Sequence, residues 1–184
     1  MTTHSQHIPC TGHHMSDFSR VKVDAAQTGF FRGREYRSFK ELSIATGTTY
    51  VIKVVVPVNT ILQGLEIDAD DGYLRMATVV GGVAGGVFSE TLPIFNRNNM
   101  TVGPDRGSLV LPQLLVTAGG THIGGTELDV FRIRTANASG GVSSVGRSAG
   151  DERGVAPNTY YFKFTNLGNT TILGTFHVRW EERG

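Results

Sequence analysis

The chain has 184 residues, of which 17 are Lys or Arg and 16 are Asp or Glu, so its formal net charge is +1. This length is enough for one well-buried core and too short for two ordinary domains. The near balance of charges excludes a global electrostatic attraction to nucleic acid, although it leaves room for a local basic patch. The single cysteine, Cys10, excludes an intrachain disulfide.

The composition favours strands over helices and gives no sign of a membrane segment. The longest apolar stretch, Tyr50–Val58, contains Lys53 and Pro57 and is far shorter than the roughly 20 residues of a membrane-spanning helix. The first residues lack the charged and apolar regions of a secretory signal. Glycine is abundant and no segment keeps a 3.6-residue apolar period, which predicts an all-β protein of short strands and tight turns.

The N-terminal residues differ from the rest of the chain. Residues 1–17 have no apolar periodicity and are predicted to form an arm that is flexible or ordered only by a partner. Residues 18–184 are predicted to form a single β-sandwich domain. Zinc or copper ligand types occur in the arm, at His4, His7, Cys10, His13 and His14. Their spacing matches no standard structural site, so a solvated or partner-bound arm is favoured over a metal centre.

Alternation of apolar and polar residues predicts the strands in chain order. Tyr36–Ile44 alternates, and Thr49–Val56 is the densest β-branched run, which predicts a central strand that Pro57 ends. Further strands are predicted at Ile61–Asp68, Tyr73–Val80, Phe88–Phe95, Leu109–Thr117 and Leu128–Thr135.

The connections carry turn and loop signals. Asp68–Gly72 predicts a hairpin turn, and the weaker calcium-loop alternative lacks the Glu that would close the loop. The glycine run Gly81–Gly86 is not followed by Lys-Ser/Thr or by a helix, so it predicts a mobile strand connection and no phosphate cradle. Asn96–Ser108 and Ala136–Pro157 are long loops, which are usually functional or ordered by a partner.

The C-terminal segment has the clearest strand pattern. Tyr160–Thr165 and Thr171–Trp180 are predicted to form an antiparallel hairpin around Asn166–Asn169. The predicted inward face of the last strand is formed by Ile172, Gly174, Phe176, Val178 and Trp180. We expect Phe162, Phe176 and Val178 to share a core layer with the inward face of Thr49–Val56. With about nine to eleven strands, the pattern predicts an antiparallel β-sandwich, jelly-roll-like in type.

No catalytic constellation emerges. His122 and His177 are not accompanied by a Gly-x-Ser-x-Gly nucleophile elbow, so we expect neither an enzyme nor a cofactor. The basic and aromatic segment Phe18–Lys40 is compatible with single-stranded nucleic acid, but docking on an acidic protein neighbour is favoured. Partner contacts are predicted at Arg32, Arg34, Arg37, Arg97, Arg106, Arg147 and Arg153.

Several short motifs resemble a group of small β-sandwich structural proteins of tailed bacteriophages, over about residues 30–183. They are Phe30-Phe31-Arg32, Phe39–Ile44, Gly47–Lys53, Asp151–Gly154, Asn158–Tyr161, Asn166–Gly168 and Trp180–Arg183. The resemblance implies a virion protein assembled in the host cytoplasm, most simply a capsid cement or decoration protein. The implied partners are the major capsid protein and further copies of the chain, as a trimer or dimer.

The alternative that the resemblance leaves open is a tail- or fibre-associated virion protein. Such a protein would contact other tail proteins or host carbohydrate, through Trp180, Tyr160 and nearby loops. A third possibility, a hydrolase of the cell envelope, would need a pair of carboxylates in a cleft.

Overall fold

The computed structural model describes residues 29–30, 32–70, 72–97, 111–134, 143–146 and 153–183, with the backbone alone for 143–146. The predicted arm with its histidine cluster, together with Arg106 and Arg147, lies outside the described residues, as does much of the two long loops. The described chain is all-β, with fourteen strands. No helix in this part of the chain is long and apolar enough to cross a membrane.

The strands form two six-stranded sheets and one small sheet, all antiparallel. Sheet A contains β1 (Glu35–Ile44), β3 (Thr60–Ala69), β7 (Ile94–Asn96), β11 (Ser143–Gly146), β12 (Arg153–Val155) and β14 (Ile172–Glu182). Sheet B contains β2 (Thr49–Val56), β4 (Tyr73–Val80), β6 (Glu90–Thr91), β8 (Leu115–Ala118), β10 (Thr126–Arg134) and β13 (Asn158–Asn166). The small sheet pairs β5 (Val83–Gly85) with β9 (Thr121–Ile123).

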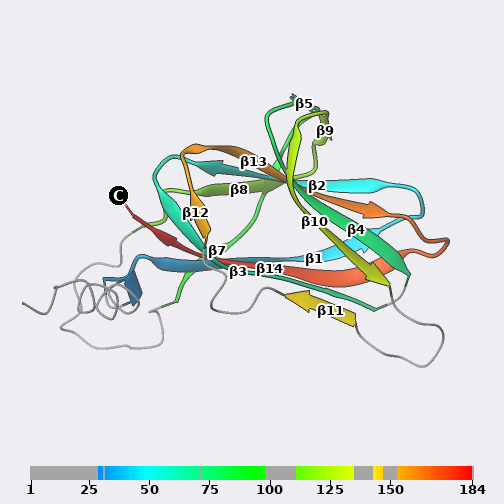
Figure 1. Cartoon of the computed structure of the whole chain (residues 1–184), viewed down its shortest axis with the longest axis horizontal. Helices are drawn as coiled ribbons and strands as arrows, with labels where there is room; N and C mark the ends of the chain where they lie inside the picture. The colour runs from blue at the N-terminus through cyan, green and yellow to red at the C-terminus, as the bar shows by residue number, and fades with distance from the viewer. Residues whose placement is uncertain are drawn as a thin grey trace, which may run out of the picture.

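The strand order places early and late parts of the chain side by side. Sheet A runs β11-β3-β14-β1-β7, with β12 also on β3, and sheet B runs β10-β4-β13-β2-β8-β6. The pairings are nested: β1 lies beside β14, β2 beside β13, β3 beside β11 and β4 beside β10. The two sheets pack face to face as an antiparallel β-sandwich (Figure 1).

The inward faces of both sheets form one apolar core. Phe176 of sheet A is fully buried, and its ring centroid lies 5.1 Å from that of Phe162 and 5.0 Å from that of Phe164, both in sheet B. Ile52 and Val178 belong to the same cluster. The predicted core layer is therefore confirmed.

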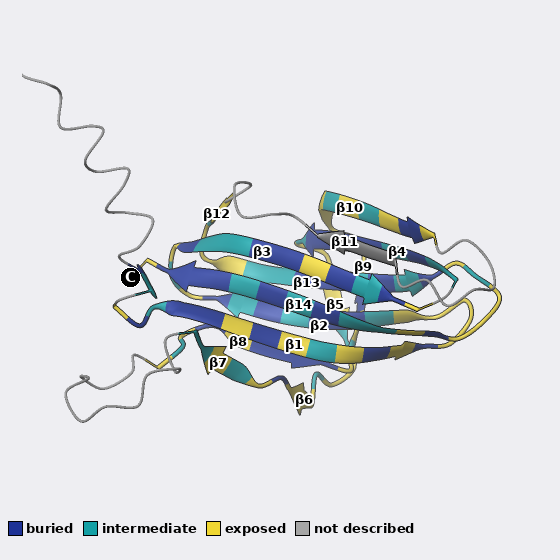
Figure 2. Cartoon of the chain, turned by 90° about the horizontal axis from the view of Figure 1, so that it is seen from below, coloured by how far each residue is buried: buried dark blue, intermediate teal, exposed yellow. Residues whose placement is uncertain are grey.

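Alternation along the strands is confirmed as well, as Figure 2 shows for β1. Leu42 and Ile44 are buried in the core, whereas Phe39, Glu41 and Ser43 face solvent. Strand side chains alternate with period two, so every second residue of β1 points away from sheet B.

The predicted C-terminal hairpin is wrong. β13 pairs with β2 and β4 in sheet B, and β14 pairs with β1 and β3 in sheet A. The short segment between β13 and β14 therefore crosses from sheet B to sheet A. Asn166, which is fully buried, stabilises this crossing segment. Its Nδ2 donates to the carbonyls of Ile44 (2.8 Å) and Thr170 (2.7 Å), and its Oδ1 accepts from the Gly168 amide (2.8 Å).

The predicted hairpin at Asp68–Gly72 is wrong for the same reason. β3 lies in sheet A and β4 in sheet B, so this connection also crosses the sandwich. Asp70 helps to hold it, because its Oδ1 accepts a hydrogen bond of 2.9 Å from the Leu173 amide and its own amide donates to the Leu173 carbonyl (3.0 Å).

Other predicted segments are subdivided. Phe88–Phe95 is not one strand but the short β6 and β7, separated by Pro93, which has no amide to donate to a ladder. β8 begins only at Leu115, and the predicted loop Ala136–Pro157 contains β11 and β12. Gly81–Gly86, predicted as a mobile strand connection, includes β5, and the described strands number fourteen instead of nine to eleven.

Replacing Phe176 with Ala should lower the free energy of unfolding by about 3–5 kcal/mol, because it removes the ring between Phe162 and Phe164. His177, the next residue, lies on the opposite face and is only partly buried, so His177→Ala should cost less than about 1 kcal/mol. Urea denaturation of both variants measures the difference. A larger loss for His177→Ala would contradict the assignment of the two faces.

Candidate interaction surfaces

The outer face of sheet A carries an aromatic strip formed by Arg37, Phe39, Phe95 and His177. The Phe39 and Phe95 rings are stacked, with centroids 5.8 Å apart and planes inclined by 10°. His177 lies 5.9 Å from Phe39, and the Arg37 guanidinium carbon lies 5.8 Å from the Phe95 centroid. The two phenylalanines are 37% and 38% exposed. An exposed aromatic cluster with an adjacent arginine has the composition of a protein-contact surface.

Strand register builds this strip from three separate segments. Arg37 is opposite Phe95 in the β1–β7 pair, and Phe39 is opposite His177 in the β1–β14 pair. Arg179 extends the positive charge, because it is opposite Arg37. Gly64 makes room for it: a Cβ at Gly64 would lie 2.8 Å from the Arg179 Nε.

The outer face of sheet B carries a different surface, the β5–β9 flap, formed by residues 81–88 and 119–125. The flap projects from the sandwich on the side away from sheet A (Figure 1). Neither segment contains Lys, Arg, Asp or Glu. Val83 and Ile123, which are opposite each other in the ladder, are 70% and 76% exposed, and Val87 is 75% exposed. The flap therefore presents uncharged aliphatic side chains to solvent.

The base of the flap packs on sheet B through His122. Its ring is stacked on Tyr161, with centroids 3.9 Å apart, and is only 6% exposed. Nε2 donates to the Gly81 carbonyl at 2.7 Å, and Nδ1 is buried without a hydrogen-bond partner in the described part of the chain. Gly82 is required here, since its φ is +80° and a Cβ would lie 2.7 Å from Nε2.

The structure does not bring the predicted contact arginines together. Arg32 and Arg37 are exposed, and Arg34 is partly buried. Arg97, two residues after Phe95, donates hydrogen bonds to the side chains of Glu35 (2.7 Å) and Gln63 (3.2 Å). Arg153 pairs with Asp129 of β10 at the far edge of the sandwich. Of the described arginines in the predicted set, only Arg37 lies in the aromatic strip.

Two expected surface aromatics point inward. Trp180 is 2% exposed and contacts Tyr36 at a centroid distance of 5.9 Å. Tyr160 is partly buried, and its hydroxyl donates to the Ala156 carbonyl (2.9 Å). Trp180 therefore exposes too little of its ring for a carbohydrate contact.

Sequence reasoning missed three buried carboxylates near the ends of β1 and β14. Glu35 is held by Arg97 and Glu181 by Arg183 (2.8 Å). Glu182 accepts from the amides of Gln113 (3.0 Å) and Leu114 (3.1 Å), and from Trp180 Nε1 (3.2 Å). Charged residues at strand ends look like solvated positions in the sequence, and only the tertiary partners distinguish them.

Glu90 of β6 joins the two sheets along their open edge. Its carboxylate accepts hydrogen bonds from Lys40 of sheet A and from the Tyr50 hydroxyl of sheet B (2.8 Å). The Lys40 and Tyr50 hydrogen bonds lower the pKa of Glu90 below its ordinary value. Burial, followed by the hydrogen bond to Glu90, raises the pKa of Tyr50. The Glu90 carboxylate thus connects the two sheets at this edge, through one hydrogen bond from each sheet.

Candidate metal ligands do not gather in the described residues. No group of three or more His, Cys, Asp or Glu side chains lies within reach of a common ion there. Asp70 of the weak calcium-loop motif already accepts the Leu173 amide, and Asp71 lies outside the described residues. Comparison of the chain with family models, with curated proteins and with solved structures found no match of any kind.

Glu90→Gln should destabilise the protein at pH 7 and lose that effect in acid. A carboxyl whose pKa is lowered by folding stabilises the fold above its ordinary pKa, and this contribution disappears as the pH falls through the lowered value. The difference in melting temperature between wild type and Glu90→Gln should therefore shrink below about pH 4.5. Glu41→Gln, on the exposed face of β1, is the control, and a constant difference for Glu90→Gln down to pH 2 would contradict the role of the ionised carboxylate.

Proposed function

We propose that this chain is a non-enzymatic structural protein of a tailed bacteriophage virion, and that it binds the major capsid lattice as a cement or decoration protein. In this proposal the domain is a jelly roll, and the aromatic strip on sheet A is the surface that contacts the capsid. The β5–β9 flap on the opposite side serves contacts between copies of the chain.

The nested strand pairing supports the jelly roll. In that fold a long double-stranded ribbon is wound into two sheets, so the first strand pairs with the last, the second with the last but one, and so on. The pairs β1–β14, β2–β13, β3–β11 and β4–β10 follow this order. Jelly rolls occur in viral capsid proteins and also in lectins and cupins, so the fold favours a virion role without singling it out.

The observation that carries the proposal is the exposed Phe39–Phe95 stack with Arg37 beside it. Aromatic side chains and arginine are enriched where protein interfaces gain most of their affinity. A stack that is already formed in the free protein loses little side-chain entropy on binding. The strip therefore suits a rigid protein lattice, and it lies on strands instead of loops.

Such a protein stabilises a capsid by mass action. Its binding site spans neighbouring capsid subunits and so exists only in the assembled shell. Each bound copy then favours the shell over free subunits, by RT ln(1 + [L]/Kd) for a single site. No chemical step is needed.

Phe95→Ser should weaken binding to shells of the cognate major capsid protein by about 30-fold, the effect of losing an interface hot spot of roughly 2 kcal/mol. Leu173→Ser is the matched control, because Leu173 is also an exposed apolar residue on the outer face of sheet A but lies outside the strip. Co-sedimentation with shells measures the affinity, and shell disruption temperature measures the stabilisation. Equal binding by wild type and Phe95→Ser would contradict the proposed surface.

The copy number in purified virions separates the lattice role from the tail alternative. A lattice protein is present in hundreds of copies per particle, whereas a tail component follows the cyclic symmetry of the tail and is present in far fewer. Quantitative mass spectrometry against the major capsid protein measures this number. A count of only a few copies would place the chain at the tail.

Ile123→Asp should shift the protein from an oligomer to a monomer, because it places a charge in the uncharged flap that we assign to contacts between copies. Leu167→Asp is the control: Leu167 is 46% exposed and follows β13 outside the flap. Light scattering after size exclusion measures the mass. An unchanged oligomer in Ile123→Asp would remove the flap from the self-association surface, and a monomeric wild type would contradict the homo-oligomer itself.

A further inference from the structure

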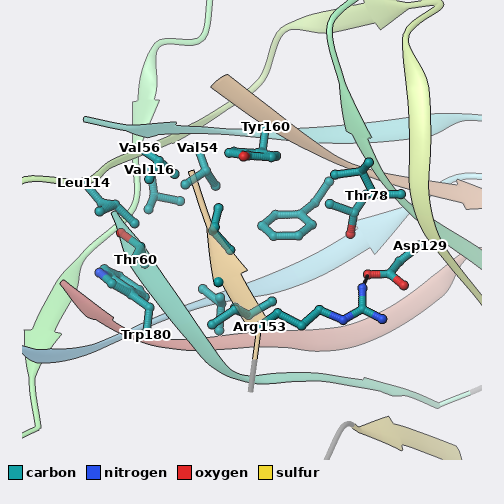
Figure 3. A pocket seen from close by; sticks show the side chains of 16 residues that line it. Val54, Val56, Thr60, Thr78, Leu114, Val116, Asp129, Arg153, Tyr160 and Trp180 are labelled. Atoms are coloured by element: carbon teal, nitrogen blue, oxygen red, sulfur yellow. Dashed lines mark hydrogen bonds and ion pairs between the residues drawn. The ribbon is translucent and has the colours of Figure 1, made fainter. Parts of the chain in front are cut away.

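The sandwich contains a partly enclosed cavity of about 310 Å³ between its two sheets. The walls come from β2, β4, β8, β10 and β13 of sheet B and from β3, β12 and β14 of sheet A. Figure 3 shows Val54, Val56 and Tyr160 on one side and Trp180 and Thr60 on another. Val178, Phe162, Leu62 and Leu114 complete a largely apolar lining.

The cavity exists because the inward side chains become smaller toward this end of the sandwich. In β4 the inward series Leu74, Met76 continues with Thr78, which is smaller and lines the cavity. In β2 the facing positions are Val54 and Val56. By contrast, the opposite end of the core is filled by Phe164 and Phe176.

Water is a poor occupant of this space. The Tyr160 hydroxyl donates to the Ala156 carbonyl, and the Thr60 hydroxyl donates to the Val58 carbonyl (3.0 Å), so both already have backbone partners. A buried water molecule needs two to four polar partners, and apolar cavities without them stay dry and accept apolar guests. The remaining polar groups of the lining are the Thr78 hydroxyl and the Asp129–Arg153 pair, so the rest of the cavity favours hydrocarbon.

The polar groups at the edge of the cavity form one neutral pair. Asp129 of β10 and Arg153 of β12 make an ion pair across the gap between the two sheets (Figure 3). The bond joins Arg153 Nη1 to Asp129 Oδ2. The pair offers one set of donors and one set of acceptors, and its charges offset each other. It favours a head group that can both donate and accept, with no net charge.

We propose that this cavity binds the alkyl tail of an uncharged single-chain amphiphile, with a hydroxyl-type head at the Asp129–Arg153 pair. The volume sets the length of the tail: about 310 Å³ holds about ten non-hydrogen atoms, at the roughly 30 Å³ that a water molecule occupies in the liquid. A medium-chain alcohol of eight to ten carbons is the simplest such ligand. This site is independent of the capsid-binding proposal, since it lies inside the sandwich and uses none of the residues of the aromatic strip.

Trp180 allows a direct test, because it is the only tryptophan of the chain and it lines the cavity. Bromine-tagged decanol should quench its fluorescence in the full-length protein, and untagged 1-decanol should reverse the quenching by competition. In a series of 1-alkanols, affinity should rise about fourfold per methylene, as expected for a buried CH₂, and level off near ten carbons. Absence of quenching, or a rise that continues unchanged to longer chains, would overturn the proposal.

Cavity-filling variants locate the binding. Thr78→Leu should weaken 1-decanol binding at least tenfold and raise the melting temperature of the ligand-free protein, because the larger side chain occupies the cavity. Thr175→Leu, the same change on the outer face of sheet A, should leave binding unchanged. Val54→Leu is a smaller filling change at a second wall position and should weaken binding in the same direction. Equal decanol binding by wild type, Thr78→Leu and Val54→Leu would overturn the assignment.

The head group is tested with three ten-carbon ligands. Decanol should bind more tightly than decanoate and than decyltrimethylammonium, because the mouth carries a neutral ion pair. Arg153→Gln should weaken decanol binding and raise the relative affinity of the cation, since it removes a positive charge beside the Asp129 carboxylate. Tighter binding of decanoate than of decanol by the wild-type protein would overturn the neutral head group.

Discussion

The fold depends on side-chain contact between strands that are neighbours in sequence but lie in opposite sheets. β13 and β14 share no backbone ladder, so the packing of Phe162 and Phe164 on Phe176 holds them together. The chain can cross the sandwich in a short connection only if its polar backbone groups are satisfied there. Asn166 meets this requirement with three hydrogen bonds of its side chain, one of them to the end of β1. The aromatic packing and the Asn166 hydrogen bonds together fix the passage of the chain from sheet B to sheet A.

The same strand order also determines where the aromatic strip and the β5–β9 flap form. Because β1 pairs with β14 and β7 at once, Phe39 contacts both Phe95 and His177, which are far apart in sequence. On the other sheet, β5 lies in the connection from β4 to β6 and β9 lies in the connection from β8 to β10, and these two connections pair with each other above the surface. Sheet packing thus leaves one flat aromatic face and one projecting aliphatic face, on opposite sides of the domain.

The sequence predicted which way side chains point far better than which strands pair. Period-two alternation identified the inward face of β14 and the two alternating faces of β1, because burial of one side of a strand is visible in the local sequence pattern. The same pattern contains no information about the partner strand. Asn166–Asn169 fits a hairpin and a crossing equally well, and only the fully buried amide of Asn166 distinguishes them. In the same way, the place of Arg37 beside Phe95 depends on the β1–β7 register, which the sequence pattern does not contain.

The core is filled at one end of the sandwich and contains the cavity at the other, and this difference affects both the stability of the domain and its proposed ligand binding. At one end large aromatic side chains fill the space between the sheets, and at the other Thr78, Val54 and Val56 leave it open. Two polar contacts hold the walls of the open end in position. Glu182 binds the amides of Gln113 and Leu114 and so fixes the segment that contributes Leu114 to the cavity. The Arg153–Asp129 pair joins the edges of the two sheets at the mouth. A void kept open by such contacts costs stability in proportion to its volume, and an apolar guest that fills it recovers part of that loss.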